Sequence, residues 1–173
     1  MVQDLVKKLR VVPDYPVKGI MFWDVTTLFK DPDALREVVD ATYEIYKDKG
    51  ITKVVGIESR GFVVGAALAV KLGAGFVPAR KPGKLPAPSW SESYYKEYGK
   101  DNVEIHQDAI EPGDVVLIHD DILATGGTVA AAERLVRRGA PAKVYVNFII
   151  ELGELGGRAK MPADTEVTAL LNL

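Results

Sequence analysis

The sequence predicts an α/β fold, a central parallel sheet flanked by helices, in one domain of 173 residues. Short apolar runs rich in β-branched residues indicate buried strands at residues 53–57, 76–79, 115–118 and 143–150. Segments with a helical spacing of apolar residues separate most of these runs. Because strands that alternate with helices form parallel sheets with right-handed crossovers, this order predicts the fold class.

The composition is that of an ordinary globular protein, with 47% hydrophobic and 27% charged residues. A net charge of -2 argues against broad nucleic-acid binding. No apolar run reaches the length of a membrane span, and Met1 begins no signal-peptide pattern. The absence of cysteine excludes disulfides and thiol catalysis, and two separated histidines do not suit a zinc site. A cytoplasmic protein without a nucleic-acid or membrane partner is predicted.

The first fifty residues predict two helices around an irregular stretch. Residues 3–10 have the pattern of a short amphipathic helix, whereas residues 11–29 are broken by prolines and a glycine and are rich in aromatic residues. Asp31 then suits an N-cap and Pro32 the first helical position, and Gly50 is placed to end this helix.

The middle of the chain predicts a strand–helix–strand unit and then a long loop. The strand at 53–57 is followed by the polar group Glu58 to Gly61 and an apolar helix. Residues 80–99 have little intrinsic structure, and a hairpin is predicted from Tyr94 onward with its return arm at 102–110. Because a loop this long in a compact domain is usually functional or disordered, we interpret it as a lid hinged at both ends. The tail after Gly153 carries no clear signal.

The most informative stretch is VVLIHDDILATGGT, at residues 115–128. The small-residue loop at 124–128 leads from a strand into a helix, and exposed backbone N–H groups at a helix N-terminus bind phosphate. Asp120 and Asp121 would repel a bare phosphate, but they suit a ligand that also carries a diol or a magnesium ion. The stretch therefore predicts a site for a ribose 5-phosphate unit, at the sheet edge that residues 58–61 also face.

Four blocks of the sequence resemble the adenine phosphoribosyltransferases, a subfamily of the type I phosphoribosyltransferases. They are DYPVKGIMFWDVT, GIESRGFVVGA, ARKPGKLPAPSWSESYYKEYG and HDDILATGGT, and they cover most of residues 14–128 in the family's order. The ATGGT loop is typical of the adenine group, whereas hypoxanthine–guanine enzymes usually carry D-T-G-x-T and orotate enzymes T-A-G-T. The resemblance implies one phosphoribosyltransferase domain over residues 1–173, with an N-terminal hood at about 1–30 and a flexible catalytic lid at about 80–99.

The resemblance also implies an activity in purine salvage. Adenine and 5-phospho-α-D-ribose 1-diphosphate (phosphoribosyl diphosphate) would give AMP and diphosphate. The implied cofactor is Mg²⁺, held mainly by the substrate, with Asp120 or Asp121 as alternative ligands. The implied assembly is a homodimer in the cytoplasm.

The roles of individual residues follow by position in the matching blocks. The implied catalytic residues are Arg60, Glu97, Asp120 and Asp121. The 5′-phosphate would be held by Ala124, Thr125, Gly126, Gly127 and Thr128. Diphosphate would be held by Arg60, Arg80 and Lys84, the last two across a dimer interface as one possibility. The adenine site would comprise Met21, Phe22, Trp23 and Tyr98.

Two positions depart from the family pattern, and two alternatives stay open. Trp23 stands where the family often has arginine, which leaves the strictness of the adenine preference undecided. His119 replaces a usually apolar residue, and two neighbouring acids would favour its charged form and let it orient Asp120. The alternatives are a non-catalytic sensor of phosphoribosyl diphosphate and a purine phosphoribosyltransferase with another base specificity. Glu97, which sensors of this kind typically lose, favours the enzyme, and the physiological direction of the reaction stays open.

Overall fold

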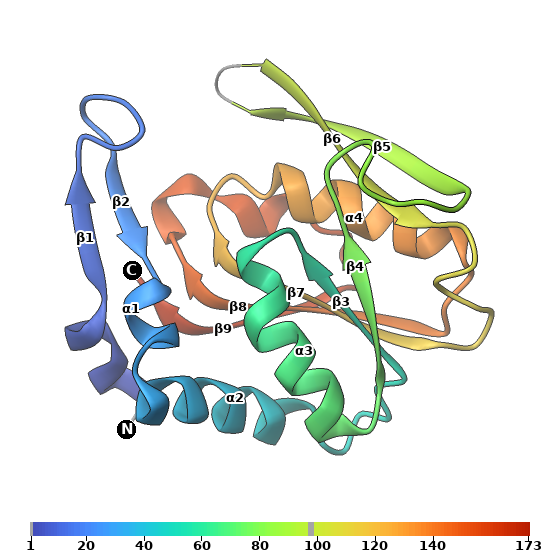
Figure 1. Cartoon of the computed structure of the whole chain (residues 1–173), viewed down its shortest axis with the longest axis horizontal. Coiled ribbons are helices and arrows are strands. Elements are labelled where there is room, and N and C mark those ends of the chain that lie inside the picture. Colours follow the sequence, from blue (N-terminus) through green and yellow to red (C-terminus); the bar gives the residue numbers. More distant parts are fainter. Residues whose placement is uncertain (1, 97–98) are drawn as a thin grey trace.

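The computed structural model describes residues 2–96 and 99–173. Its centre is a five-stranded sheet in which every neighbouring pair is parallel (Figure 1). The strands, in spatial order, are β4 (Gly75–Ala79), β3 (Lys53–Ile57), β7 (Val115–Leu123), β8 (Lys143–Glu151) and β9 (Glu166–Asn172). The predicted α/β fold class is confirmed, and β3 has the predicted boundaries.

Helices cover both faces of this sheet. On one face, α2 (Pro32–Tyr46) and α3 (Arg60–Leu72) pack with Val54 and Leu117 through Tyr46 and Leu68. On the other face, α4 (Gly127–Arg138) packs its buried Leu135 in one core with neighbouring sheet residues such as Val116. Because successive side chains of a strand point to opposite faces, both cores are built by the same buried strands. None of the helices in the described part of the chain is long and apolar enough to cross a membrane.

The predicted start of α2 is confirmed in detail. The Asp31 side chain accepts hydrogen bonds from Asp33 N at 3.0 Å and Ala34 N at 3.1 Å, and Pro32 is the first helical residue. Such a cap satisfies backbone donors that the helix leaves free. The helix ends at Tyr46, and Gly50 takes its positive φ of 66° in the turn beyond it.

The N-terminal segment is more ordered than the sequence indicated. A 3₁₀ helix, η1 (Val2–Lys8), precedes two short antiparallel strands, β1 (Arg10–Pro13) and β2 (Met21–Asp24), and a helical turn, α1 (Thr26–Phe29). The stretch predicted to be irregular thus contains a hairpin. In Figure 1 this β1–β2 hairpin stands at one side of the molecule, beyond the carboxyl end of the sheet.

A second hairpin, β5 (Ser89–Lys96) with β6 (Gly99–His106), lies over α4. Its first arm begins at Ser89, not at Tyr94, so the predicted boundary was wrong. Trp90 and Tyr94 face the core, but Glu92 lies between them and binds Arg134 and Arg138 of α4. An acid on the inward face hides the apolar alternation that indicates a strand.

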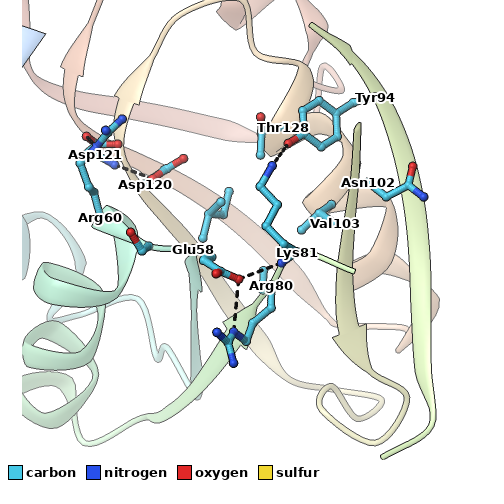
Figure 2. Close-up of a pocket in the computed structure, with 13 residues that line it drawn as sticks. Glu58, Arg60, Arg80, Lys81, Tyr94, Asn102, Val103, Asp120, Asp121 and Thr128 are labelled. Atoms are coloured by element: carbon cyan, nitrogen blue, oxygen red, sulfur yellow. Dashed lines mark hydrogen bonds and ion pairs between the residues drawn. The ribbon is translucent and has the colours of Figure 1, made fainter. Parts of the chain in front are cut away.

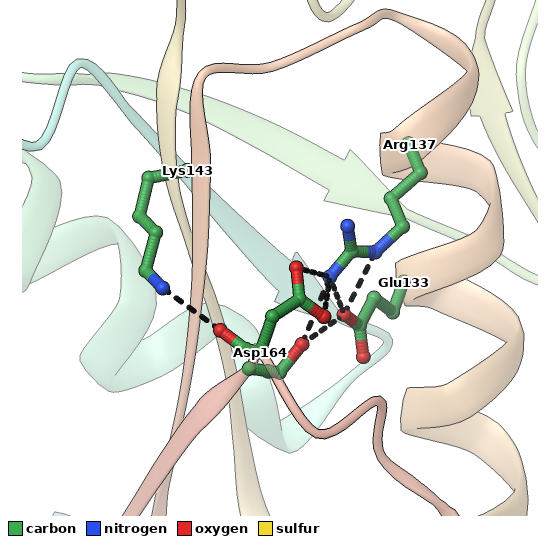
Figure 3. A network of polar contacts seen from close by, with 5 residues as sticks. Glu133, Arg137, Lys143 and Asp164 are labelled. Atoms are coloured by element: carbon green, nitrogen blue, oxygen red, sulfur yellow. Dashed lines mark hydrogen bonds and ion pairs between the residues drawn. The ribbon is translucent and has the colours of Figure 1, made fainter.

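The C-terminal tail is also built into the fold. It forms two short 3₁₀ segments, η2 (Gly153–Leu155) and η3 (Gly157–Lys160), and then β9. Figure 3 shows how the end of α4 is tied to the chain before β9: the Arg137 guanidinium donates to Glu133 at 3.0 Å and to Asp164 at 3.1 Å, and Lys143 donates to the Asp164 carbonyl. The tail therefore fixes one end of α4 against the sheet.

Candidate active site

The candidate site lies where β3 and β7 end side by side. These strands pair in parallel, so the residues that follow Ile57 lie beside the second half of β7. The strand β7 is longer than predicted and continues through Asp120 and Asp121 to Leu123. Arg60 Nε donates to Asp121 Oδ2, which confirms that the two polar groups face one another.

A cavity of about 320 Å³ opens at this edge (Figure 2). The polar residues that line it are Glu58, Ser59, Arg60, Arg80, Lys81, Tyr94, Asn102, Asp120, Asp121 and Thr128. The structure thus brings together the predicted residues from three distant blocks. The Lys84 side chain does not line this cavity, although its carbonyl accepts from the Arg80 guanidinium at 3.3 Å.

The ion pair of Arg60 and Asp121 is anchored in the protein. The Asp121 side chain is 4% exposed, whereas that of Arg60 is 43% exposed and faces the cavity. The Arg60 guanidinium also lies 5.4 Å from the ring centroid of Phe22, on β2. One cation therefore links the sheet edge to the N-terminal hairpin and keeps open donors for an anion.

The carboxylate of Asp120 has a different environment. It accepts from the backbone N–H of Asp121 at 2.9 Å, and no basic side chain in the described ranges forms an ion pair with it. Burial and the neighbouring Asp121 charge raise the pKa of Asp120 well above its usual range. A partly buried carboxylate without a cationic partner is suited to hydroxyl donors or a cation.

A second, smaller cavity of about 80 Å³ lies in the turn from β7 into α4. It is lined by the five predicted loop residues, Ala124, Thr125, Gly126, Gly127 and Thr128. Gly126 takes a φ of 79°, and the helix begins at the next residue. Backbone N–H groups and the positive end of the helix dipole therefore meet at this turn, as an anion site requires. Asp120 and Thr128 line both cavities, so the two spaces adjoin.

Sequence reasoning missed Lys81, although it lies next to Arg80 in the ARKPGK block. Its ammonium group contacts Asp101 and donates to the Tyr94 hydroxyl at 3.0 Å, so it spans from the loop after β4 to the β5–β6 hairpin. Its backbone N–H donates to Glu58 Oε2 at 2.8 Å, and this bond is the main reason that the pKa of Glu58 is lowered. Glu58 also accepts from Arg80, which places two cations at one wall of the cavity.

Comparison with known proteins identifies the family. The phosphoribosyl transferase domain family matches residues 24–164. The adenine phosphoribosyltransferase of Phocaeicola vulgatus is 62% identical over 171 residues, which are 99% of this chain and 98% of that protein. The chain belongs to the adenine phosphoribosyltransferase family. It is therefore a purine-salvage transferase that converts adenine and phosphoribosyl diphosphate to AMP, and the non-catalytic alternative is set aside.

Solved structures of the family have the same fold. The enzyme from Rhodothermus marinus matches with a TM-score of 0.94 and 51% identity over 99% of this chain and 98% of that one. The enzyme from Saccharomyces cerevisiae, solved with an imino-altritol bisphosphate and adenine, matches with a TM-score of 0.92 and 42% identity over 98% of both chains.

The residues implied for adenine are only partly described. Phe22 packs edge-on against Tyr15, with ring centroids 5.0 Å apart, and Met21 is exposed. Trp23 packs against the core formed by Leu5 and its neighbours, so this departure from the family pattern serves the packing of the N-terminal segment. Glu97 and Tyr98 lie outside the described residues.

The prediction for His119 was wrong. The imidazole is fully buried, and burial lowers its pKa to about 4, so it is neutral at physiological pH. Its Nδ1 bonds to Asn147 Oδ1 at 2.9 Å on β8, not to Asp120. Desolvation outweighs the nearby negative charges, which the sequence alone could not reveal. His119 is thus a neutral core residue of the sheet.

Proposed function

We propose that this chain transfers 5-phosphoribose to N9 of adenine at the edge of the sheet where β3 and β7 end. One observation carries the proposal: the loop cavity and the larger basic cavity adjoin at Asp120 and Thr128. A ribose beside Asp120 can therefore place its 5′-phosphate in the loop and its 1-diphosphate toward the basic residues.

Phosphoribosyl diphosphate is held by hydrogen-bond donors and cations at its phosphates and by carboxylates at its ribose. Backbone N–H groups of residues 124–128 and the Thr125 and Thr128 hydroxyls bind the 5′-phosphate. Asp120 accepts from the ribose hydroxyls, and Asp121 shares the ribose face and holds Arg60. Arg60, with Arg80 and Lys81 on the opposite wall, binds diphosphate, and Lys84 of a partner subunit adds to this charge.

This distribution of charge matches the expected transition state. As the bond from ribose to diphosphate breaks, positive charge develops on the ribose and negative charge on the leaving group. The two aspartates lie on the ribose side, and the cations lie on the diphosphate side. Groups fixed in this way stabilise the separating charges without reorganisation during the reaction.

Magnesium fits this donor set as an ion that arrives with the substrate. Family members generally use Mg²⁺ with phosphoribosyl diphosphate. In the described part of the chain no group of three or more acids or histidines could hold a metal alone. Asp120, which lacks a cationic partner, is the carboxylate placed to complete the ion's shell, since Mg²⁺ usually combines substrate oxygens, water and one or two carboxylates. The bound ion would neutralise charge on diphosphate.

The two hairpins supply the base site. The β1–β2 hairpin acts as the hood, with the Phe22 ring over adenine and the backbone of Met21 and Trp23 at its edge. The lid at about residues 80–99, which includes β5, supplies Glu97 and Tyr98 to the base. Glu97 holds or accepts a proton of the purine imidazole while N9 bonds to carbon. A closed lid also keeps water from the reactive donor.

The homodimer is proposed to form along α3. Its outward face is an apolar stripe of small and branched residues, Val63, Ala66, Ala67 and Val70, and Val70 is 83% exposed. Such a stripe on a helix indicates an unpartnered packing surface, and a second copy of the chain is the occupant that would also bring its Lys84 to a shared site.

The chain's lack of cysteine is consistent with a cytoplasmic location.

An assay of diphosphate release with adenine, hypoxanthine, guanine and xanthine tests the function. We expect adenine to be the preferred base and excess chelator to abolish turnover. Equal or faster turnover of hypoxanthine or guanine would contradict the adenine preference, and Trp23 would be the first residue to exchange. Activity that is unchanged by chelator would contradict the magnesium role.

A further inference from the structure

The loop that leads into α4 is covered from outside by the segment that follows β8 (Figure 1). Gly157, the first residue of η3, lies against the backbone of Ala124 and Gly126. A Cβ added to Gly157 would overlap the Ala124 carbonyl and lie 2.8 Å from Leu123 Cδ1 and 3.0 Å from Gly126 N. A Cβ added to Gly126 would in turn lie 3.0 Å from the Gly157 carbonyl carbon. The two backbones touch, and neither position has room for a side chain.

This covering segment is anchored to the sheet. The Arg158 guanidinium donates through Nε to Glu151 Oε1 at 3.0 Å and makes a second contact to the same carboxylate. It also donates through Nη1 to the Val167 carbonyl at 2.5 Å. Glu151 ends β8 and Val167 belongs to β9. A bidentate ion pair and a hydrogen bond to a backbone carbonyl therefore hold η3 against these strands.

We propose that Gly157, held by Arg158, is a positioning residue for the loop Ala124–Thr128, and that it sets the affinity for the phosphate monoester of the ribose donor. This inference rests on the proposed phosphate-binding role of that loop. The loop's inner side faces the small cavity, and its outer side rests on Gly157. A backbone that is braced from behind keeps its N–H groups aimed at the anion before the ligand arrives, so less affinity is lost to ordering.

The expected signature is selective. A substitution that moves the loop should weaken binding of the phosphoribosyl group and leave the adenine site unchanged. The nearest atoms to a Cβ at Gly157 belong to Leu123, Ala124 and Gly126, not to Phe22 or to the described residues of the β5–β6 hairpin. Mere loss of packing would instead lower thermal stability and the active fraction without changing the affinity of the molecules that remain folded. Affinities for the two substrates therefore separate positioning from packing.

The test compares four variants of the whole protein. Gly157→Ala adds a methyl group at the contact, and Arg158→Gln removes the anchor without adding an atom there. Gly153→Ala is the matched control, because a Cβ at that nearby glycine meets nothing within 4 Å. Thr128→Ala tests the phosphate site itself. The measurements are the Kd for ribose 5-phosphate by calorimetry, the KM for each substrate, kcat and the thermal midpoint.

We expect Gly157→Ala to raise the Kd for ribose 5-phosphate and the KM for the donor by about tenfold or more, since the loop must shift to admit the methyl group. Arg158→Gln should act in the same direction by about threefold, and the adenine KM should change less than about twofold in both. Gly153→Ala should behave as the unmodified protein. If Gly157→Ala does not fold, the donor and adenine KM values of Arg158→Gln decide the question.

The contrary outcomes separate the two proposals. If Thr128→Ala weakens ribose 5-phosphate binding but Gly157→Ala and Arg158→Gln do not, the loop binds phosphate and Gly157 does not position it. If Thr128→Ala leaves that affinity unchanged, the phosphate role of the loop is itself wrong. Parallel losses for donor and adenine in Gly157→Ala and Arg158→Gln would reduce Gly157 to a packing role.

Discussion

The donor half and the base half of the site are built from different parts of the fold. The aspartates and the loop at 120–128 belong to β7 and the start of α4, in the middle of the sheet and between two helical layers. Phe22 stands on a two-stranded hairpin, and the proposed lid is a second two-stranded hairpin packed over α4. Figure 1 shows the two hairpins rising on either side of the sheet edge.

This contrast separates the rigid part of the site, which carries out the chemistry, from the more mobile part, which recognises the base. Residues fixed between packed layers can hold charges in one arrangement, which electrostatic stabilisation of a transition state needs. Residues on small hairpins can move with less disturbance of the core, as admission and enclosure of a base require. Substitutions in the donor half should therefore affect chemistry and stability together, and substitutions in the hairpins should affect chemistry or base binding with little effect on stability.

The largest effect is expected at the lid. Glu97→Gln keeps the shape of the side chain but cannot accept a proton, so kcat should fall by about 10²- to 10⁴-fold. The donor KM and the thermal midpoint should change little. Steady-state kinetics with both substrates and a thermal melt check this, with Ser91→Ala, an exposed position on β5, as the control. Near-normal kcat would remove the acid–base role, and a selective loss of donor affinity would move Glu97 to the metal.

The next effect is expected at the two aspartates, which should respond differently. Asp120→Asn should lower kcat by about 10²-fold or more, because a charge facing the ribose is lost. Since its pKa is raised in the folded protein, the charged form costs stability at neutral pH, and the neutral amide should make the protein more stable. Asp121→Asn should lower kcat and also destabilise the fold, because it breaks the ion pair between the buried Asp121 carboxylate and the partly exposed Arg60.

Urea unfolding at pH 7, combined with kcat, measures this difference. Asp108→Asn, at an exposed turn after β6, controls for the general effect of removing an acid. Normal turnover in a folded Asp120→Asn variant would show that this carboxylate does not serve the ribose. A loss of stability in the same variant would show that the Asp120 charge has a partner that stabilises it.

A smaller effect is expected at the hood. Phe22→Ala should raise the adenine KM by about tenfold, because stacking of a base on an aromatic ring contributes about 1–3 kcal/mol. The donor KM should rise less, although the Arg60 guanidinium loses the ring that lies 5.4 Å from it. Val11→Ala, on the neighbouring strand of the same hairpin, is the control for changes in the hood itself. An unchanged adenine KM would place the base elsewhere.

The sequence predicted the parts of this molecule that are specified locally. The Asp31 cap, the strand β3 and the loop before α4 follow from residues next to one another in the chain. The second half of β7 was missed because Asp120 and Asp121 interrupt its apolar run. The start of β5 at Ser89 was missed because Glu92 lies on the inward face of the strand. In each case a polar residue is satisfied by a partner that is distant in sequence or is kept for function.

Other features depend on contacts that no local pattern encodes. Gly157 meets Gly126 only in the folded chain, and Lys81 faces the cavity because Asp101 of the hairpin lies opposite. The charge of His119 was mispredicted for the same reason: neighbouring acids are visible in the sequence, whereas burial is a property of the packed sheet. The charges beside His119 could be read from the sequence, whereas its loss of solvation on burial could not.

The smallest effect is expected at His119, which tests whether the donor half is as firmly packed as proposed. Its folded pKa of about 4 lies below the 6.5 of an ordinary histidine, so between these values the unfolded chain binds a proton that the folded chain does not. Stability should therefore fall as the pH drops from about 6.5 toward about 4, by about 1 kcal/mol from this group at about pH 5.5. His119→Leu should flatten that slope. Asp120 and Asp121 are present in both proteins, so the difference between the two pH profiles isolates the imidazole. The measurement is the free energy of unfolding by urea at several pH values, with His106→Leu as the comparison that removes the other histidine. An unchanged slope in His119→Leu would mean that the imidazole takes up a proton in the folded sheet, and that the core beside the aspartates admits water more readily than its packing indicates.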